Sequence, residues 1–270
     1  MEKTKELLHH TSRRSLNAFL GFISALGGGV NLLYSTAYAL FRPPFYFRLF
    51  TEQLYQLGFK SLSLTLITAL STGMVMTLQF GLGLERFGGK LYVPKIVGLS
   101  ILRELGPILT CLMLAGRVGS GVAAEIGSMK VTQQIDAIRA LGTDPIKRIV
   151  VPRVLAMVLI APMLTLFADI VGILGGIFIA YVELNIDPTF YFHEALVGLR
   201  PIDFMVGISK TVLFGLTIGV TGCYYGLSTE GGTQGVGQAT TRSVVTASIL
   251  IVVQDFILTK VWWLYERGMQ

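Results

Sequence analysis

Charged residues are scarce in this sequence. Asp, Glu, Lys and Arg make up 14% of its 270 residues, whereas a soluble domain has about 25%. This scarcity excludes an ordinary soluble enzyme, and the 16 Phe and 10 Tyr exclude a disordered chain. The mean hydropathy of +0.65 indicates an integral membrane protein made of helices. At about 20 residues per span, the length allows five or six spans and short loops.

Cysteine and histidine are also rare. Cys111 and Cys223 lie inside separate apolar runs, so we expect buried free thiols rather than a disulfide. The glycine-rich stretch Glu230–Arg242 lacks the Lys-Ser/Thr pair of a phosphate-binding loop, and we predict a tight turn there. No metal-ligand set is formed by the three histidines, His9, His10 and His193. We therefore expect no catalytic centre, metal or cofactor in this chain.

Long apolar runs are present instead, and they predict helical spans. In hydrocarbon each backbone amide must be paired within its own segment, and the runs do not alternate as the strands of a membrane barrel do. We predict an all-α, single-domain membrane protein covering residues 1–270. Its five predicted spans are Leu57–Leu84, Ile96–Ala115, Val154–Val182, Phe204–Leu227 and Ser243–Leu264.

The basic residues predict the orientation of these spans. Seven Lys or Arg residues lie in Met1–Lys60 and five in Glu125–Arg153, whereas Tyr181–Asp203 has one against four acidic residues. The first two regions are therefore expected in the cytoplasm and the third outside, which places the N-terminus inside and the C-terminus outside. We predict that residues 16–41, interrupted by three consecutive glycines, form an interfacial or re-entrant helix and not a sixth span.

A short amphipathic helix is predicted at Glu125–Ala140, between the second and third spans. Val131, Ile135 and Ile138 follow helical spacing, and Gly142 with the Asp-Pro turn after it ends the helix. The spacing alone is compatible with a solvated loop helix or with a helix that docks into a soluble partner.

Two adjacent charges, Arg103 and Glu104, interrupt the second apolar run. Each costs roughly 2.5 to 3.5 kcal/mol on membrane-insertion scales, so both should face a cavity or a partner and not lipid. They point about 100° apart and cannot easily pair with each other. A neutralised pair that only fixes helix packing is the alternative. Lys210, Asp169 and Asp255 raise the same question.

Ordered blocks of residues resemble the MlaE-type permeases, ABC-transporter subunits that move lipids with MCE-domain proteins. The match runs from about Leu54 to Thr259. Its most specific parts are Leu102–Leu109, Ala115–Ser120, Ala124–Met129, Gln134–Ile138, Gly142, Asp144-Pro145, Pro152-Arg153, Ala239–Val245 and Asp255-Phe256.

The resemblance implies a permease without its own nucleotide site. It implies a homodimer on two ABC ATPase subunits, which would bind ATP and magnesium, and an MCE-domain protein on the external side. A small STAS-type accessory subunit and a soluble lipid carrier belong to the same expectation, and nucleic acid does not. The implied location is a bacterial inner membrane, and the implied cargo is phospholipid.

The resemblance also implies which residues serve each role. The central lipid cavity would be lined by Met76, Gln79, Phe80, Gly83, Leu84, Arg103 and Glu104, with Arg103 suited to a phosphate as a planar donor fork. Lys210 and Asp255 would be cavity or gating charges. Coupling to the ATPase would use Glu125, Met129, Thr132, Gln133, Ile135, Asp136 and Ile138.

Two other functions remain open at this point. Arg103, Glu104, Asp169 and Asp255 could form the relay of an ion-coupled carrier, although five spans without an inverted repeat argue against it. A non-transporting membrane scaffold would use the same charges only for assembly.

Overall fold

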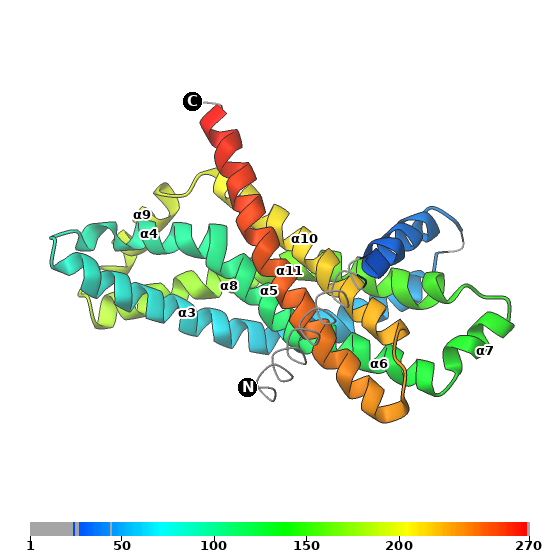
Figure 1. The fold of residues 1–270 in the computed structure, drawn as a ribbon. Helices are drawn as coiled ribbons and strands as arrows, with labels where there is room; N and C mark the ends of the chain where they lie inside the picture. The colour runs from blue at the N-terminus through cyan, green and yellow to red at the C-terminus, as the bar shows by residue number, and fades with distance from the viewer. Residues whose placement is uncertain (1–23, 25–26, 44, 269–270) are drawn as a thin grey trace, which may run out of the picture.

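The computed structural model describes residue 24, residues 27–43 and residues 45–268, and every regular element in this part of the chain is helical. Five of the described helices are long and apolar enough to cross a membrane (Figure 1). They are Phe47–Glu85, Lys90–Val131, Ile146–Val182, Pro201–Leu227 and Gly232–Gly268. The predicted all-α membrane architecture is confirmed, and Cys111 and Cys223 are free and buried as expected.

Several long helices are built from shorter elements. The first contains α2 (Phe47–Gln53), a π-helical segment (Leu54–Phe59) and α3 (Lys60–Glu85). The second contains η2 (Lys90–Tyr92), α4 (Val93–Ser100), η3 (Ile101–Leu105), α5 (Gly106–Leu114), η4 (Ala115–Gly119) and α6 (Ser120–Val131). The remaining elements are α7 (Gln134–Ala140), η5 (Ile146–Val150), α8 (Val151–Val182), α9 (Pro188–Val197), α10 (Pro201–Leu227) and α11 (Gly232–Gly268).

The first two long helices extend well beyond their predicted spans. They have 39 and 42 residues, which at 1.5 Å per residue is about 60 Å, twice the roughly 30 Å of a hydrocarbon core. The difference arises because apolar composition marks only the part that fits hydrocarbon, whereas the backbone hydrogen-bonding of a helix continues into the aqueous layers.

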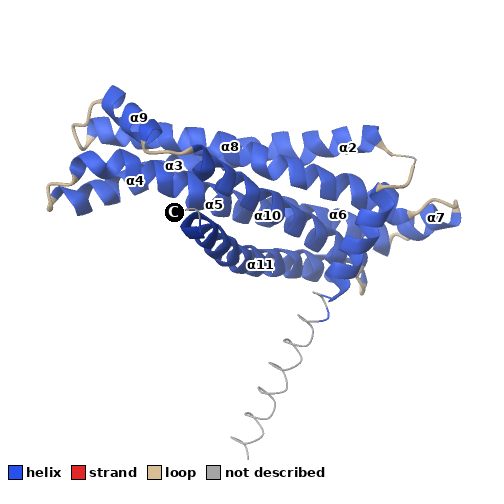
Figure 2. Cartoon of the chain, turned by 90° about the horizontal axis from the view of Figure 1, so that it is seen from above, coloured by secondary structure: helices blue, strands red, loops and turns tan. Residues whose placement is uncertain are grey.

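Two apolar cores are arranged along α8. The larger contains Leu114, Met157 and Phe214 and joins α5, α6, α8, α10 and α11. The smaller contains Val97, Ala180 and Tyr191 and joins α4, the end of α8 and α9. Figure 1 shows α7 at one end of the molecule and α9 at the other, and the view from above in Figure 2 shows the same separation. The fold is therefore elongated, with distinct ends.

Close helix packing depends on small residues, as is usual in membranes. Where α3 crosses α8, a Cβ at Gly73 would lie 1.8 Å from the carbonyl oxygen of Gly172. A larger side chain at position 73 would push the two helices apart.

The glycine-rich stretch differs from its prediction as a turn. The turn is confined to residues 228–231, and α11 begins at Gly232, where Gly231 and Gly232 have φ of +83° and +69°. Helix packing outweighs the low helix propensity of glycine here: Val236 lies close to Gly127 of α6, and Ala239 is buried.

The N-terminal helix is described only in part. Residues 27–40 are helical, so the glycine triplet lies within a helix, whereas residues 16–23 lie outside the described residues. A Cβ at Gly28 would lie 2.3 Å from the Tyr224 ring. The triplet is thus a contact surface for α10.

Candidate functional site

Six charged side chains from three helices meet near the start of α10 and the end of α11. We name this group the charged cluster. Its members are Arg103 and Glu104 of η3, Asp203 and Lys210 of α10, and Asp255 and Glu266 of α11. Arg103 and Glu104 each pair with other helices and not with each other.

Arg103 connects the second, fourth and fifth long helices. Its Nε donates to Asp203 Oδ1 at 2.6 Å, and its Nη2 donates to Glu266. Asp203 is fully buried, and its Oδ2 accepts from the backbone N–H of Arg200 at 2.7 Å. The first turn of α10 therefore orients the carboxylate that binds Arg103.

Lys210 is fully buried within the same cluster. Its Nζ donates to Glu104 Oε2 at 2.6 Å, to Thr259 Oγ1 at 2.7 Å and to the Arg103 carbonyl at 3.1 Å. That carbonyl is available because Pro107, four residues on, has no N–H to donate to it. Asp255 Oδ1 lies 3.0 Å from Nζ as an ion pair, outside hydrogen-bonding geometry.

The charged cluster contains two cations and four carboxylates. Arg200 lies at its margin, 3.9 Å from Asp203 and 3.8 Å from Glu266. Desolvated charges persist only when they are paired and hydrogen-bonded. Five members of the cluster meet both conditions, whereas Asp255 is paired with Lys210 and its Oδ1 accepts no hydrogen bond. Arg103 and Glu104 retain side-chain exposures of 23% and 38%, so the cluster reaches the protein surface. In this conformation the Arg103 fork is engaged by carboxylates and not free for a phosphate.

The five other predicted cavity residues lie on one arc of α3. Met76, Phe80 and Leu84 pack partly against the smaller apolar core, whereas Gln79 and Gly83 are exposed. The described contacts bring Arg103 and Glu104 together with Lys210 and Asp255, and they place the α3 residues in a different environment.

The predicted coupling segment is divided into two helices, which corrects the expectation of one continuous helix over 125–140. The break falls at Thr132 and Gln133, where Gln133 has φ of +60°. Thr132, Gln133 and Asp136 are exposed. Asp136 lies 3.6 Å from Arg139 and 3.9 Å from Lys130, which are surface pairs that contribute little to stability.

Three apolar residues of the coupling segment point inward, whereas Val131 is exposed. Ile135 is 2% exposed, and Met129 and Ile138 pack against the larger core. Glu125 belongs to the base of the segment, where its Oε1 accepts from the buried Arg153 of α8 at 2.6 Å. These four residues position α7, and the polar residues form its outer surface.

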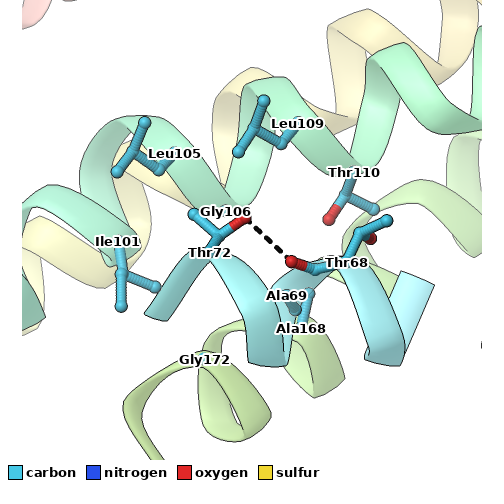
Figure 3. Close-up of a pocket in the computed structure, with 10 residues that line it drawn as sticks. All are labelled: Thr68, Ala69, Thr72, Ile101, Leu105, Gly106, Leu109, Thr110, Ala168 and Gly172. Atoms are coloured by element: carbon cyan, nitrogen blue, oxygen red, sulfur yellow. Dashed lines mark hydrogen bonds between the residues drawn. The ribbon is translucent and has the colours of Figure 1, made fainter. Parts of the chain in front are cut away.

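A narrow cavity lies between α3, α5 and α8 and is drawn in Figure 3. Its volume of about 20 Å³ has room for about one water molecule, so it does not fit a lipid. Beside it, Asp169 Oδ1 has no hydrogen-bond partner and occupies the space where Gly106 would carry a side chain. Among the described residues, no hydrogen bond or ion pair joins Asp169 to the charged cluster.

The predicted site residues do not include two members of the charged cluster, Asp203 and Glu266, or Leu141 at the tip of α7. Asp203 was counted among the external acidic residues, although Arg200-Pro201 with Asp203 three residues later is typical of a helix start. Glu266 lies beyond the predicted fifth span. Leu141 follows α7 and is 79% exposed, which is unusual for leucine and could be recognised only from its position at the tip.

Comparison with known proteins identifies the class. The sequence matches the family described as Permease MlaE over residues 50–261. A probable ABC transporter permease protein of Rickettsia felis is 39% identical over 90% of this chain and 93% of its own length. One of Synechocystis sp. is 41% identical over 80% and 81%. Protein TRIGALACTOSYLDIACYLGLYCEROL 1, chloroplastic, of Arabidopsis thaliana is 38% identical over 77% and 59%. The chain therefore belongs to the MlaE permease family and is a multi-pass membrane permease subunit of an ABC transporter.

Proposed function

We propose that this permease, as a homodimer, moves phospholipids between a bacterial inner membrane and an MCE-domain partner protein. ATP hydrolysis occurs on a separate ATPase subunit that contacts the exposed surface of α7, and an MCE-domain protein binds at the opposite, external end. The charged cluster carries the proposal, because buried ionisable groups in spanning helices mark substrate pathways. The Arabidopsis relative is named after a glycerolipid, trigalactosyldiacylglycerol.

A lipid needs an apolar wall for its chains and a polar site for its headgroup. The partly buried Met76, Phe80 and Leu84 of α3 supply the wall, and the surface-reaching part of the charged cluster supplies the polar site. Binding of a phosphate to Arg103 then requires exchange with Asp203 or Glu266. Arg103 can alternate between these partners because its planar fork carries several donors.

The second long helix connects the proposed headgroup site to the proposed ATPase-docking surface. It continues without interruption from Lys90 to Val131 and so joins η3 of the charged cluster to the base of α7. Arg103 and Val131 are separated by about 42 Å along the axis, at 1.5 Å per residue. Displacement of α7 by an ATPase is thereby transmitted to Arg103, and the π-helical segments η3 and η4 are the points where the helix can adjust.

Lipid transfer in a reconstituted complex tests the cavity. Arg103→Gln with Glu104→Gln should reduce transfer at least about tenfold while ATPase assembly persists. Lys90→Gln with Glu85→Gln is the matched control, because it removes one cation and one anion from a partly exposed pair 3.5 Å apart, outside the charged cluster, where the second helix begins. Equal transfer by both variants would refute the cavity assignment.

Co-purification tests the docking surface. Leu141→Glu should release the ATPase without lowering thermal stability, since Leu141 is exposed and the apolar anchors of α7 are unchanged. Leu91→Glu, at a 63% exposed leucine before α4, is the matched control. Retention of the ATPase by Leu141→Glu would show that the tip of α7 is not the docking surface.

A further inference from the structure

A second cavity lies away from the charged cluster. It has a volume of about 240 Å³ and is bounded by the N-terminal helix at residues 27–40, by α10 and by α11. Its walls are mainly aliphatic and include Leu33, Leu213, Leu216, Val220 and Leu250. None of these residues belongs to the predicted lipid cavity.

The position of this cavity along α10 indicates which level of the bilayer it faces. Its α10 residues, from Leu213 to Tyr225, occupy the half of the helix that ends next to α6, towards the α7 end of the molecule. A bilayer offers hydrocarbon at the middle of a spanning helix and headgroups near its end. The cavity thus begins at hydrocarbon depth and extends towards one membrane surface.

Polar groups are found at both ends of the cavity. At the deep end, Thr217 Oγ1 donates to Gln254 Oε1 at 3.0 Å. Nearer the membrane surface, the Tyr225 and Thr246 hydroxyls lie 2.8 Å apart. An aliphatic compartment with polar groups at its outer end is suited to an amphiphile.

A cation lies just outside the shallow end. Arg242 precedes Thr246 by four residues on α11, which places the two on neighbouring turns of one side of the helix. Its side chain is exposed and forms no ion pair with the residues that the structure describes. An arginine at this level matches a lipid phosphate in charge and in hydrogen-bonding geometry.

We propose that this cavity binds one acyl chain of a phospholipid from the leaflet on the α7 side, with the phosphate of that lipid at Arg242. The bound lipid fills the space between the N-terminal helix and the pair α10 and α11. Gly28, in contact with Tyr224, holds the helix close enough to form the wall. This site is independent of the proposed transport cavity and does not rest on it.

Photolabelling tests the proposal with the full chain in phosphatidylethanolamine–phosphatidylglycerol vesicles. The probe is phosphatidylglycerol with a diazirine in one acyl chain, and labelled peptides are identified by mass spectrometry. Labelling of Val220, Tyr224 and residues 29–33 is expected. Leu250→Trp, which fills the cavity, should reduce it about tenfold, whereas Val252→Trp on the exposed side of α11 should not.

The headgroup contact is tested separately, with a variant that leaves the core intact. Arg242→Gln should lower labelling several-fold, and Arg148→Gln, which removes an exposed arginine of η5 on the same side, should not. A diacylglycerol probe of the same chains should be insensitive to Arg242→Gln, because it has no phosphate.

Three results would overturn the proposal: labelling no stronger than at the Val252 surface, labelling unchanged by Leu250→Trp, or cross-links from a photoreactive residue at Leu213 to a second copy of the chain. Each can occur while Arg103 variants still abolish transfer, so this site and the proposed function are tested independently.

Discussion

Lys210 is the cation that two carboxylates of the charged cluster share, whereas each of these carboxylates pairs, among the described residues, with Lys210 alone. It is fully buried and lies within 3.0 Å of both Glu104 and Asp255. Lys210→Met leaves two carboxylates without their cation, whereas Glu104→Gln leaves Lys210 paired with Asp255. We expect Lys210→Met to destabilise the protein by about 3–5 kcal/mol and Glu104→Gln by clearly less.

Denaturant unfolding of the purified protein in detergent measures this asymmetry. The control is Lys130→Met, which removes a partly exposed lysine 3.9 Å from Asp136 and should have little effect. Equal losses for Lys210→Met and Glu104→Gln would mean that Asp255 does not share the lysine.

Gly106 and Asp169 form a pair whose packing can be tested by rescue. A Cβ at position 106 would lie 1.8 Å from Asp169 Oδ1, so Gly106→Ala should cost about 1–3 kcal/mol by overpacking. Adding Asp169→Ala removes the closest contact and should restore most of the lost stability, because the Ile101 carbonyl oxygen at 2.9 Å remains. Gly116→Ala, with open space around the new methyl group, is the control and should not destabilise in the same thermal-unfolding assay. Failure of the rescue would place the strain elsewhere.

Helix α9 begins with a pH-dependent cap. Asp187 accepts from the N–H groups of Thr189 and Phe190 at 2.9 and 3.0 Å. The Thr189 hydroxyl, followed by the backbone N–H of Phe190, lowers the pKa of this carboxyl below its usual value. The cap therefore contributes fully above the unfolded-state pKa of about 3.9, and its contribution is lost as pH falls through the lower folded-state pKa.

Hydrogen-exchange protection factors of the Thr189 and Phe190 amides report this titration. Protection should decrease as pH falls below about 4, and Asp187→Asn, which keeps a capping oxygen but does not titrate, should remove the pH dependence. A pH dependence that persists in Asp187→Asn would identify another titrating group.

Element boundaries show where local sequence information ends. The five spans follow from apolar runs alone, because hydrocarbon requires internally hydrogen-bonded backbone. Two other boundaries cannot be predicted from local sequence. The helical start of α11 depends on contacts with α6. The break at Gln133 depends on a left-handed backbone conformation that glutamine rarely adopts. In both places tertiary contacts outweigh intrinsic propensity.

The two ends of the molecule predict a labelling pattern for its orientation. Thr132→Cys and Thr189→Cys place single exposed thiols at the α7 end and at the start of α9, and the native Cys111 and Cys223 are buried. With the proposed cytoplasmic N-terminus, a membrane-impermeant maleimide should label position 189 in intact cells. It should label position 132 only after permeabilisation. The reverse pattern would invert the topology.

The unmodified chain is the control for this labelling. Buried thiols are not accessible to the reagent, so Cys111 and Cys223 should remain unlabelled in both conditions. Strong labelling of the unmodified chain would show that at least one of them becomes exposed in the membrane.

The sequence by itself determined the class of this protein: an all-α membrane permease with five spans and with Arg103 and Glu104 as costly charges. These properties follow from composition and from order along the chain. Only the tertiary structure decided which groups neutralise those charges, because Asp203 lies 100 residues from Arg103 and Glu266 lies 163 residues from it. It likewise turned Ile135 inward and formed the cavity beside the N-terminal helix. Pairing and burial depend on where distant segments meet, and local periodicity carries no information about such contacts.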